Sequence, residues 1–210
     1  MIGIIDYGMG NLYSVSKALE RMNYDYFISS SGTELNKADG LILPGVGSFK
    51  DAMSILHEKE LVFFLKESVA KGTPLLGICL GMQLLFEESE ENGLTQGLGF
   101  LKGRITKIPG VTADGETYKV PHMGWNDLEV KQQSPLLEKI DGGHVYFVHS
   151  YYAKTDSENV MASSKYDVEV PAVVGKGNVY GTQFHPEKSS DLGIKILQNY
   201  AAIVEKKVTL

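Results

Sequence analysis

The sequence contains a single cysteine and carries little positive charge for its size. One cysteine cannot form an internal disulfide, and it cannot by itself build a thiolate metal site, so we expect reducing surroundings and no zinc. The 20 lysine and arginine residues are outnumbered by 26 aspartate and glutamate residues, which leaves a net charge of -6. This balance argues against nucleic acid or an anionic membrane surface as a partner.

Long apolar runs are also missing. The sequence has no stretch of about 18 apolar residues, and no basic leader precedes a shorter one, so we expect neither a membrane span nor a secretion signal. A cytoplasmic location is the expectation that follows. With 43% hydrophobic residues, the chain can bury one substantial core, and we expect residues 1–210 to form a single domain.

The first half of the chain alternates between short apolar runs and helical patterns. Apolar runs at 1–6, 40–43 and 74–78 read as buried strands, and apolar residues at helical spacing lie between them. Strands that alternate with helices predict a mostly parallel central sheet with helices on both faces.

The pattern changes in the second half. From Arg104 to about Gly181, β-branched and aromatic runs are separated by Gly, Pro, Asn and Asp, which predicts antiparallel strands packed beside the parallel sheet. A final helix with one apolar face begins near Leu192. We interpret the acidic run Glu87–Glu91 as a solvated helix end and loop. The predicted fold class is α/β: a mostly parallel central sheet flanked by helices, with an additional antiparallel β region in the second half.

The single thiol lies between two glycines, in Gly77-Ile78-Cys79-Leu80-Gly81. This spacing is typical of a nucleophile elbow, in which a strand turns sharply into a helix and raises the central side chain above the sheet. The flanking glycines are needed because side chains at both positions would collide across the bend. A sulfur at a helix N-terminus is favoured as the thiolate. The plain alternative is a buried structural cysteine.

A second motif, Gln183-Phe184-His185-Pro186-Glu187, favours the nucleophile. Pro186 disfavours helical geometry at His185, so we expect an extended segment in which His185 and Glu187 point to the same side. A surface turn is the alternative for this motif taken alone. Together with the elbow, it predicts Cys79 as nucleophile, His185 as base and Glu187 as the acid that orients the base.

Acyl transfer also requires donors for the oxyanion that develops on the carbonyl oxygen. The backbone N–H groups of Val46, in Pro44-Gly45-Val46-Gly47, and of Leu80, at the start of the elbow helix, are the candidates. Taken alone, the segment 44–47 is equally typical of a tight turn.

Other motifs that could hold a cofactor or a metal are incomplete. Gly8-Met9-Gly10 lacks the third glycine of a dinucleotide fingerprint, and the segment 45–48 lacks the Gly-Lys pair of a phosphate-binding loop. His144 and His149 are five residues apart on one predicted strand, so they face opposite sides and do not suit a shared metal site. We therefore expect no cofactor and no metal.

The P-G-x-G segment, the G-x-C-x-G elbow and the late H-P-E, in this order, resemble the class I (triad-type) glutamine amidotransferases over nearly the whole chain. The resemblance implies that Cys79 attacks the side-chain amide of glutamine and that His185 gives a proton to the departing ammonia. A thioester remains, which water hydrolyses to glutamate. The positions matched to the family's substrate pocket are Gly47, Gln83, Ser150 and Tyr151.

Two stretches, Asp6–Leu12 and Pro121–Asn126, narrow the resemblance to glutaminases of histidine biosynthesis that work with a separate (β/α)₈-barrel cyclase. It implies a heterodimer in which ammonia passes through an internal channel, and in which the glutaminase is slow until the partner is loaded. The expected contacts with the cyclase are Asn11, Trp125 and Tyr146. Two explanations fit the neighbouring residues His122, Met123 and Trp125 equally well: packing in the core, or a place in an interface loop.

Three other functions stay open at this point. The chain could be a glutaminase that serves a different ammonia acceptor, a stand-alone cysteine hydrolase, or a binding module without catalysis. A stand-alone hydrolase is expected to work at full speed without a partner. A binding module is expected to leave Cys79 unmodified by a glutamine-like electrophile.

Overall fold

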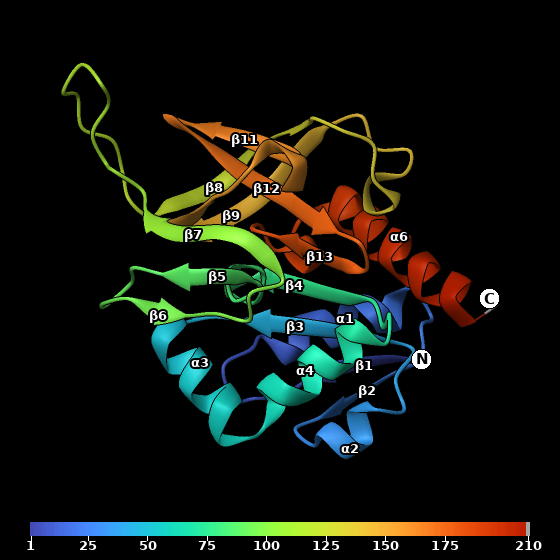
Figure 1. Ribbon diagram of the computed structural model, residues 1–210. Coiled ribbons are helices and arrows are strands. Elements are labelled where there is room, and N and C mark those ends of the chain that lie inside the picture. Colours follow the sequence, from blue (N-terminus) through green and yellow to red (C-terminus); the bar gives the residue numbers. More distant parts are fainter. Residues whose placement is uncertain (209–210) are drawn as a thin grey trace.

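A computed structural model describes residues 1–208, and its parallel strands agree with the sequence pattern (Figure 1). Five strands lie side by side in the order β2-β1-β3-β4-β13, and each pair among them is parallel. Their bounds are β1 (Ile2–Ile5), β2 (Tyr26–Ser29), β3 (Gly40–Gly45), β4 (Leu75–Cys79) and β13 (Val179–Thr182). The last of these comes from near the end of the chain and pairs directly with β4.

The antiparallel strands extend this sheet instead of forming only a separate region beside it. They continue from β13 in the order β12-β11-β8-β9, so that nine strands share one sheet. Their bounds are β8 (His122–Val130), β9 (Gly143–His149), β11 (Val160–Tyr166) and β12 (Val168–Lys176). A second sheet has the order β10-β7-β5-β6, with bounds β5 (Phe86–Ser89), β6 (Thr95–Gln96), β7 (Leu101–Lys107) and β10 (Tyr151–Lys154).

Helices cover both faces of the parallel strands. On one face, α1 (Leu12–Arg21) and α6 (Ser190–Val208) bury their apolar sides against Ile2, Ile4 and Ile42. On the other, α3 (Phe49–Glu58) and α4 (Leu61–Ala70) pack with the second sheet around Leu41 and Leu43. The short helices are α2 (Gly32–Leu35) and α5 (Leu80–Gln83), and 3₁₀ turns occur at Pro135–Leu137, Ser157–Asn159 and Pro186–Lys188. Among residues 1–208, no helix is both long enough and apolar enough to cross a membrane.

The apolar run 145–153 does not form one strand. It divides at Ser150: β9 ends in the large sheet and β10 begins in the small one. The backbone therefore changes sheets within one residue, beside the end of β4. This crossing brings residues from both sheets to one edge of the molecule.

The acidic run is not a solvated helix end. Glu87 and Glu88 lie in strand β5, and Ser89 is fully buried. The carboxylates accept hydrogen bonds from backbone N–H groups that are distant in sequence: Glu87 from Gly103 at 2.9 Å and Glu90 from Lys107 at 3.0 Å. The run thus fastens β5 to β7, because acceptor side chains satisfy N–H groups that the strand ladder leaves unpaired.

Candidate active site

Cys79 lies where strand β4 ends and helix α5 begins. Its backbone has φ 56° and ψ -111°, a conformation that costs a non-glycine residue about 1–3 kcal/mol. A Cβ on Gly77 would lie 2.6 Å from the carbonyl oxygen of Gly81, and a Cβ on Gly81 would lie 1.8 Å from that of Leu43. The elbow and its need for two glycines are confirmed. The helix after it has four residues.

His185 follows strand β13, the direct neighbour of β4 in the parallel sheet. Parallel neighbours end at the same edge of a sheet, so the chain delivers His185 next to Cys79. His185 Nδ1 and Glu187 Oε1 are 2.8 Å apart, and both side chains are buried. This contact forms differently from the expected extended segment. His185 itself is extended, but Pro186 begins a 3₁₀ turn, and the turn carries Glu187 back to the imidazole.

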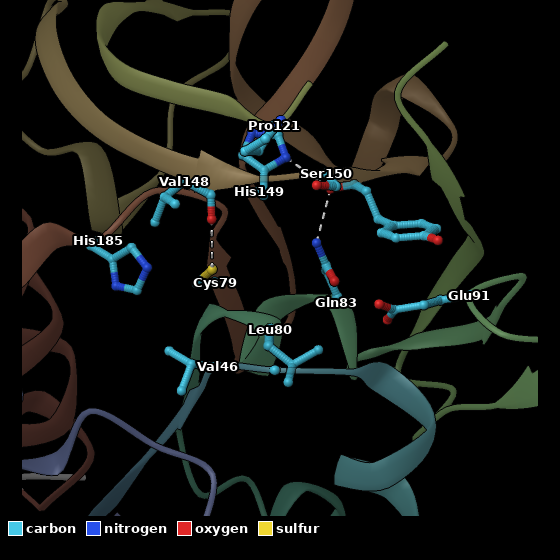
Figure 2. Close-up of a pocket in the computed structure, with 12 residues that line it drawn as sticks. Val46, Cys79, Leu80, Gln83, Glu91, Pro121, Val148, His149, Ser150 and His185 are labelled. Carbon is cyan, nitrogen blue, oxygen red and sulfur yellow. Dashed lines mark hydrogen bonds between the residues drawn. The ribbon is translucent and has the colours of Figure 1, made fainter. Parts of the chain in front are cut away.

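Cys79 and His185 line one cavity of about 400 Å³, and Figure 2 shows the imidazole turned toward the sulfur. The sulfur lies 3.9 Å from the carbonyl oxygen of Val148. On another side, the Nε2 of Gln183 points at it from 3.9 Å. The expected substrate-contact positions Gly47, Gln83, Ser150 and Tyr151 line the same cavity.

Two partners keep a proton on His185. Burial lowers its pKa, but the hydrogen bonds and negative charges of Cys79 and Glu187 outweigh burial and raise the pKa of His185 to about 10. At neutral pH the ring is therefore an imidazolium beside the sulfur. Glu187 is almost fully buried, and within residues 1–208 its Oε2 has no hydrogen-bond partner. The role of this carboxylate is therefore its contact with the imidazole of His185.

The expected oxyanion donors differ in their geometry. The N–H of Val46 donates to the carbonyl oxygen of Met9 at 2.7 Å, so in this structure it does not serve as an oxyanion donor. The sequence pattern missed this because the acceptor belongs to the loop after β1, 37 positions earlier in the chain. Leu80 opens helix α5, where the first N–H groups have no partner inside the helix. Of the two candidates, Leu80 alone is in a position that suits the role.

The amide of Gln83 is held in one orientation. Its Nε2 donates to the carbonyl oxygen of Tyr151 at 2.9 Å and to Oε1 of Gln183 at 3.0 Å. Both amide hydrogens are used, so Oε1 is the atom that Gln83 offers to a ligand in the cavity. Tyr151 contributes its backbone carbonyl to this arrangement.

Glu91, His149 and Gln183 also belong to the site, although the sequence motifs did not identify them as site residues. Gln183 is fully buried and links Gln83 to Cys79. Its position two residues before His185 was the one available signal. Glu91 lines the cavity, and its Oε2 accepts the N–H of Phe49 at 2.7 Å. It was not identified from the sequence because the acidic run that contains it was interpreted as solvated.

His122 and His149 form a buried pair across strands β8 and β9, with His122 Nδ1 and His149 Nε2 3.1 Å apart. Burial lowers the pKa of His122 to about 4. Burial, opposed by the hydrogen bond to the Tyr151 carbonyl, lowers the pKa of His149 to about 3. His144 lies on the exposed side of β9, as the five-residue spacing predicts. Within residues 1–208, no three His, Cys, Asp or Glu side chains form a group that could hold a metal ion.

The segment after Pro121 is a strand, not a loop, and its side chains alternate. His122 faces the core, whereas Met123 and Trp125 are 65% and 54% exposed. The Trp125 ring contacts the Tyr146 ring edge to face at 6.1 Å between centroids. Asn11 caps helix α1 by accepting the N–H of Ser14. Core packing is therefore correct for His122 and wrong for Met123 and Trp125, whose place in an interface stays a prediction.

Comparison with known sequences adds to this geometry. Residues 3–203 match the family model described as glutamine amidotransferase class-I. The chain is 72% identical over 208 residues to a protein of Geobacillus sp. (strain WCH70) named imidazole glycerol phosphate synthase subunit HisH, with 99% of each chain covered. It is 57% identical over 210 residues to the protein of the same name from Bacillus subtilis (strain 168), again with 99% of each covered.

Solved structures with little sequence identity share the fold. One described as a glutamine amidotransferase matches with a TM-score of 0.76 at 21% identity and covers 97% of this chain and 98% of its own. A chain in the structure of PurLQS from Thermotoga maritima matches with a TM-score of 0.75 at 22% identity, over 97% of this chain and 98% of its own. With the elbow, the family model and these relatives in agreement, the chain belongs to the class I glutamine amidotransferase family.

Proposed function

We propose that the chain is the glutaminase subunit of imidazole glycerol phosphate synthase. In this role it is a single glutaminase domain of the cytoplasm that hydrolyses glutamine to glutamate and ammonia. It passes the ammonia to a separate (β/α)₈-barrel cyclase, which makes imidazole glycerol phosphate and an aminoimidazole carboxamide ribotide. The observation that carries the proposal is the meeting of Cys79 and His185 in one cavity, with Glu187 on the other ring nitrogen. The names of the full-length relatives support the choice of synthase.

The chemistry follows from the position of Cys79 and the proton on His185. The sulfur of Cys79 attacks the side-chain carbonyl carbon of glutamine, and the imidazolium of His185 gives its proton to the amide nitrogen as the C–N bond breaks. Ammonia leaves and a thioester remains. The neutral His185 then takes a proton from water, whose oxygen attacks the thioester carbon, and the C–S bond breaks to release glutamate. Glu187 holds the ring in the required tautomer throughout.

The cavity also fits the other end of glutamine. Gln83 offers an oxygen acceptor, and Glu91 adds a carboxylate that points into the cavity in Figure 2. Two acceptors, one of them charged, suit an α-ammonium group. Gln183 directs an amide N–H at the sulfur of Cys79 from 3.9 Å.

The hydrogen bond from Val46 to Met9 supports a resting state without a complete oxyanion hole. Rotation of the Gly45–Val46 peptide would turn this N–H toward the cavity. Met9 lies two residues before Asn11, an expected contact with the cyclase. Binding of the cyclase at Asn11 would therefore move the Met9 carbonyl oxygen, which accepts the N–H of Val46. One missing oxyanion donor costs about 3 kcal/mol of transition-state stabilisation, or about a hundredfold in rate. Equal glutamine turnover by the isolated chain and by the complex would contradict this account.

The deciding experiment is Cys79→Ala in the complex with the cyclase. We expect glutamine-dependent synthesis to disappear and synthesis from added ammonium salt to survive, because the cyclase accepts ammonia from solution. Wild-type complex assayed with both nitrogen sources is the control. Loss of both activities in a folded complex would mean that the cysteine is structural. Glutaminase activity that responds to a different synthase, and not to this cyclase, would instead favour another acceptor.

A further inference from the structure

A line of hydrogen bonds crosses the antiparallel part of the large sheet and ends at the cavity. It begins at Asn126 on β8. The Oδ1 of Asn126 accepts the N–H of Asp127 at 2.8 Å, so the other amide atom is the NH₂ group. This Nδ2 lies 3.0 Å from the carbonyl oxygen of Lys165 and 3.2 Å from Nε2 of His122. The nitrogen of His122 that faces Asn126 must therefore be an acceptor and carry no proton.

The protonation of both histidines follows from this starting point. A neutral His122 without a proton on Nε2 carries it on Nδ1, and this N–H points at Nε2 of His149, 3.1 Å away. His149 Nε2 is then an acceptor, and its proton is on Nδ1. That nitrogen lies 2.8 Å from the carbonyl oxygen of Tyr151, which can only accept. Both ends of the line thus require the same pair of tautomers.

The neighbouring side chains and strands hold the two histidine rings in place. The ring of His122 is stacked on Phe147 at 4.5 Å and on Tyr166 at 3.9 Å between centroids, so it cannot rotate freely. His122 and His149 are also direct partners in the pairing of β8 with β9. An added proton on either ring would place two donors face to face. All four ring nitrogens have a defined partner.

The last acceptor of the line is shared with the substrate cavity. The Tyr151 carbonyl accepts from His149 Nδ1 and from Gln83 Nε2, so its two lone pairs are both used. With Gln183 Oε1 as its other acceptor, this carbonyl holds the Gln83 amide, so the amide turns when the carbonyl moves. If Nδ1 of His149 carried no proton, this nitrogen and the Tyr151 carbonyl oxygen would be two acceptors facing each other, and the Tyr151 peptide would shift away. The direction of the Gln83 oxygen therefore depends on the tautomer of His149.

We propose that His149 is a positioning residue for glutamine: its Nδ1–H, set by Asn126 and His122, fixes the Tyr151 carbonyl, which aims the Gln83 oxygen at the substrate's α-ammonium group. The proposal rests on the glutaminase function proposed above. It adds a role for a side chain that itself transfers no proton. The effect belongs to substrate binding, because the reacting amide carbon lies at the other end of glutamine.

Two substitutions distinguish the contributions of the two ring nitrogens of His149. Asparagine places an NH₂ group near the position of Nδ1, so His149→Asn keeps the donor to Tyr151 and loses the contact with His122. Glutamine reaches the position of Nε2, so His149→Gln keeps the contact with His122 and loses the donor to Tyr151. The matched control is His144→Gln, at the exposed histidine on the same strand. Glutaminase kinetics are measured in the complex with the cyclase.

We expect His149→Gln to raise KM for glutamine about tenfold with kcat changed less than about threefold, as for a lost hydrogen bond that orients a charged contact. His149→Asn, which keeps the donor to Tyr151, should raise KM clearly less than His149→Gln does, and His144→Gln should keep KM within about twofold of wild type. Equal effects of the Asn and Gln variants, or an effect confined to kcat, would overturn the proposal.

A measurement on the wild-type chain decides the tautomers without any activity. With ¹⁵N-labelled histidine, the NMR spectrum should contain two neutral Nδ1–H rings at pH 7, one of which disappears in His149→Asn. A proton on Nε2 of His149 would overturn the proposal even if no Gln variant folds. A wild-type complex with the expected tautomers and no glutaminase activity would instead refute the proposed function.

Discussion

At the scale of single residues, Tyr7 carries a hydroxyl that the folded chain does not satisfy. The side chain is buried, and its oxygen has no hydrogen-bond partner within residues 1–208. Burial, followed by the nearby charge of Cys79, raises the pKa of Tyr7 well above its usual range. The hydroxyl therefore bears a desolvation cost without a compensating bond.

We expect Tyr7→Phe to leave the free energy of unfolding unchanged or to raise it by about 1 kcal/mol, because the change removes an unpaired polar group. Tyr200→Phe is the matched control. The Tyr200 hydroxyl lies 2.6 Å from the carbonyl oxygen of Leu41 and 2.9 Å from that of Pro74, so its loss should cost about 1–2 kcal/mol. Urea denaturation measures both. A Tyr7→Phe chain as unstable as Tyr200→Phe would contradict the expectation.

The pKa of His149 makes stability depend on pH. Burial favours the neutral ring, and its pKa in the folded chain is about 3, below the 6.5 of an exposed histidine. The unfolded chain binds a proton below pH 6.5 that the folded chain does not, so this contribution to stability is complete above pH 6.5 and is lost as the pH falls toward 3. His185 has the opposite sign: its contribution is complete below pH 6.5 and is lost as the pH rises toward about 10.

For His149 the loss should reach about 1.4 kcal/mol for each pH unit below 6.5. Urea denaturation at pH 5, 6 and 7 measures this slope. His149→Asn should remove this part of the slope and leave the part due to His122, whose pKa burial also lowers, whereas His144→Gln should leave the whole slope unchanged. The same slope in wild type and in His149→Asn would show that other groups cause the acid sensitivity.

At the scale of secondary-structure elements, the elbow depends on how closely β3 approaches α5. Gly81→Ala places a Cβ 1.8 Å from the carbonyl oxygen of Leu43, so the strand or the helix must move. We expect a loss of about 3 kcal/mol or more in the free energy of unfolding. Gly115→Ala is the control, since its φ of +85° is strained but no atom lies within 4 Å of the new Cβ. It should cost only about 1 kcal/mol. Similar costs at the two positions would mean that the elbow adapts.

Strands β1, β3 and β4 could be predicted from the sequence because each is a local apolar run, whereas β2 was not among the predicted strands and the segment of β5 was interpreted as a helix end. The elbow could also be predicted, since its geometry depends on neighbours in sequence. The pairing of His185 with Glu187 was predicted too, but it forms through a 3₁₀ turn and not through the expected extended segment. The partner of Val46 is 37 positions away, and the carboxylates of Glu87 and Glu90 accept N–H groups 16 and 17 positions away, so no local pattern reveals them. Glu91 and His149 were missed as site residues for the same reason: their partners come from other strands and helices.

At the scale of the whole molecule, the exposed Trp125 and the partly buried Tyr146 beside it are the expected contact with the cyclase. Large aromatic side chains dominate binding energy in many interfaces. We expect Trp125→Ala to weaken binding of the cyclase at least about tenfold in a calorimetric titration. Because Trp125 is more than half exposed, the free energy of unfolding should change by no more than about 0.5 kcal/mol.

The control for this surface is Phe63→Ala on helix α4, where the side chain is 70% exposed. It should leave binding of the cyclase unchanged. If Phe63→Ala weakened binding as much as Trp125→Ala, the contact surface would have to include helix α4. If neither change mattered, the aromatic pair would not belong to the interface.

The parallel pairing of β4 with β13 has a consequence for tolerance to insertion and deletion. In this pairing Thr182 lies opposite Ile78. Cys79 follows one residue after Ile78, and His185 follows three residues after Thr182, so these two numbers set the position of the imidazole relative to the sulfur. Adding or deleting one residue between positions 182 and 185 would misplace the imidazole. The turn between Val111 and Thr117 lies outside this count, so natural variation or an engineered graft there can change length without altering the catalytic spacing.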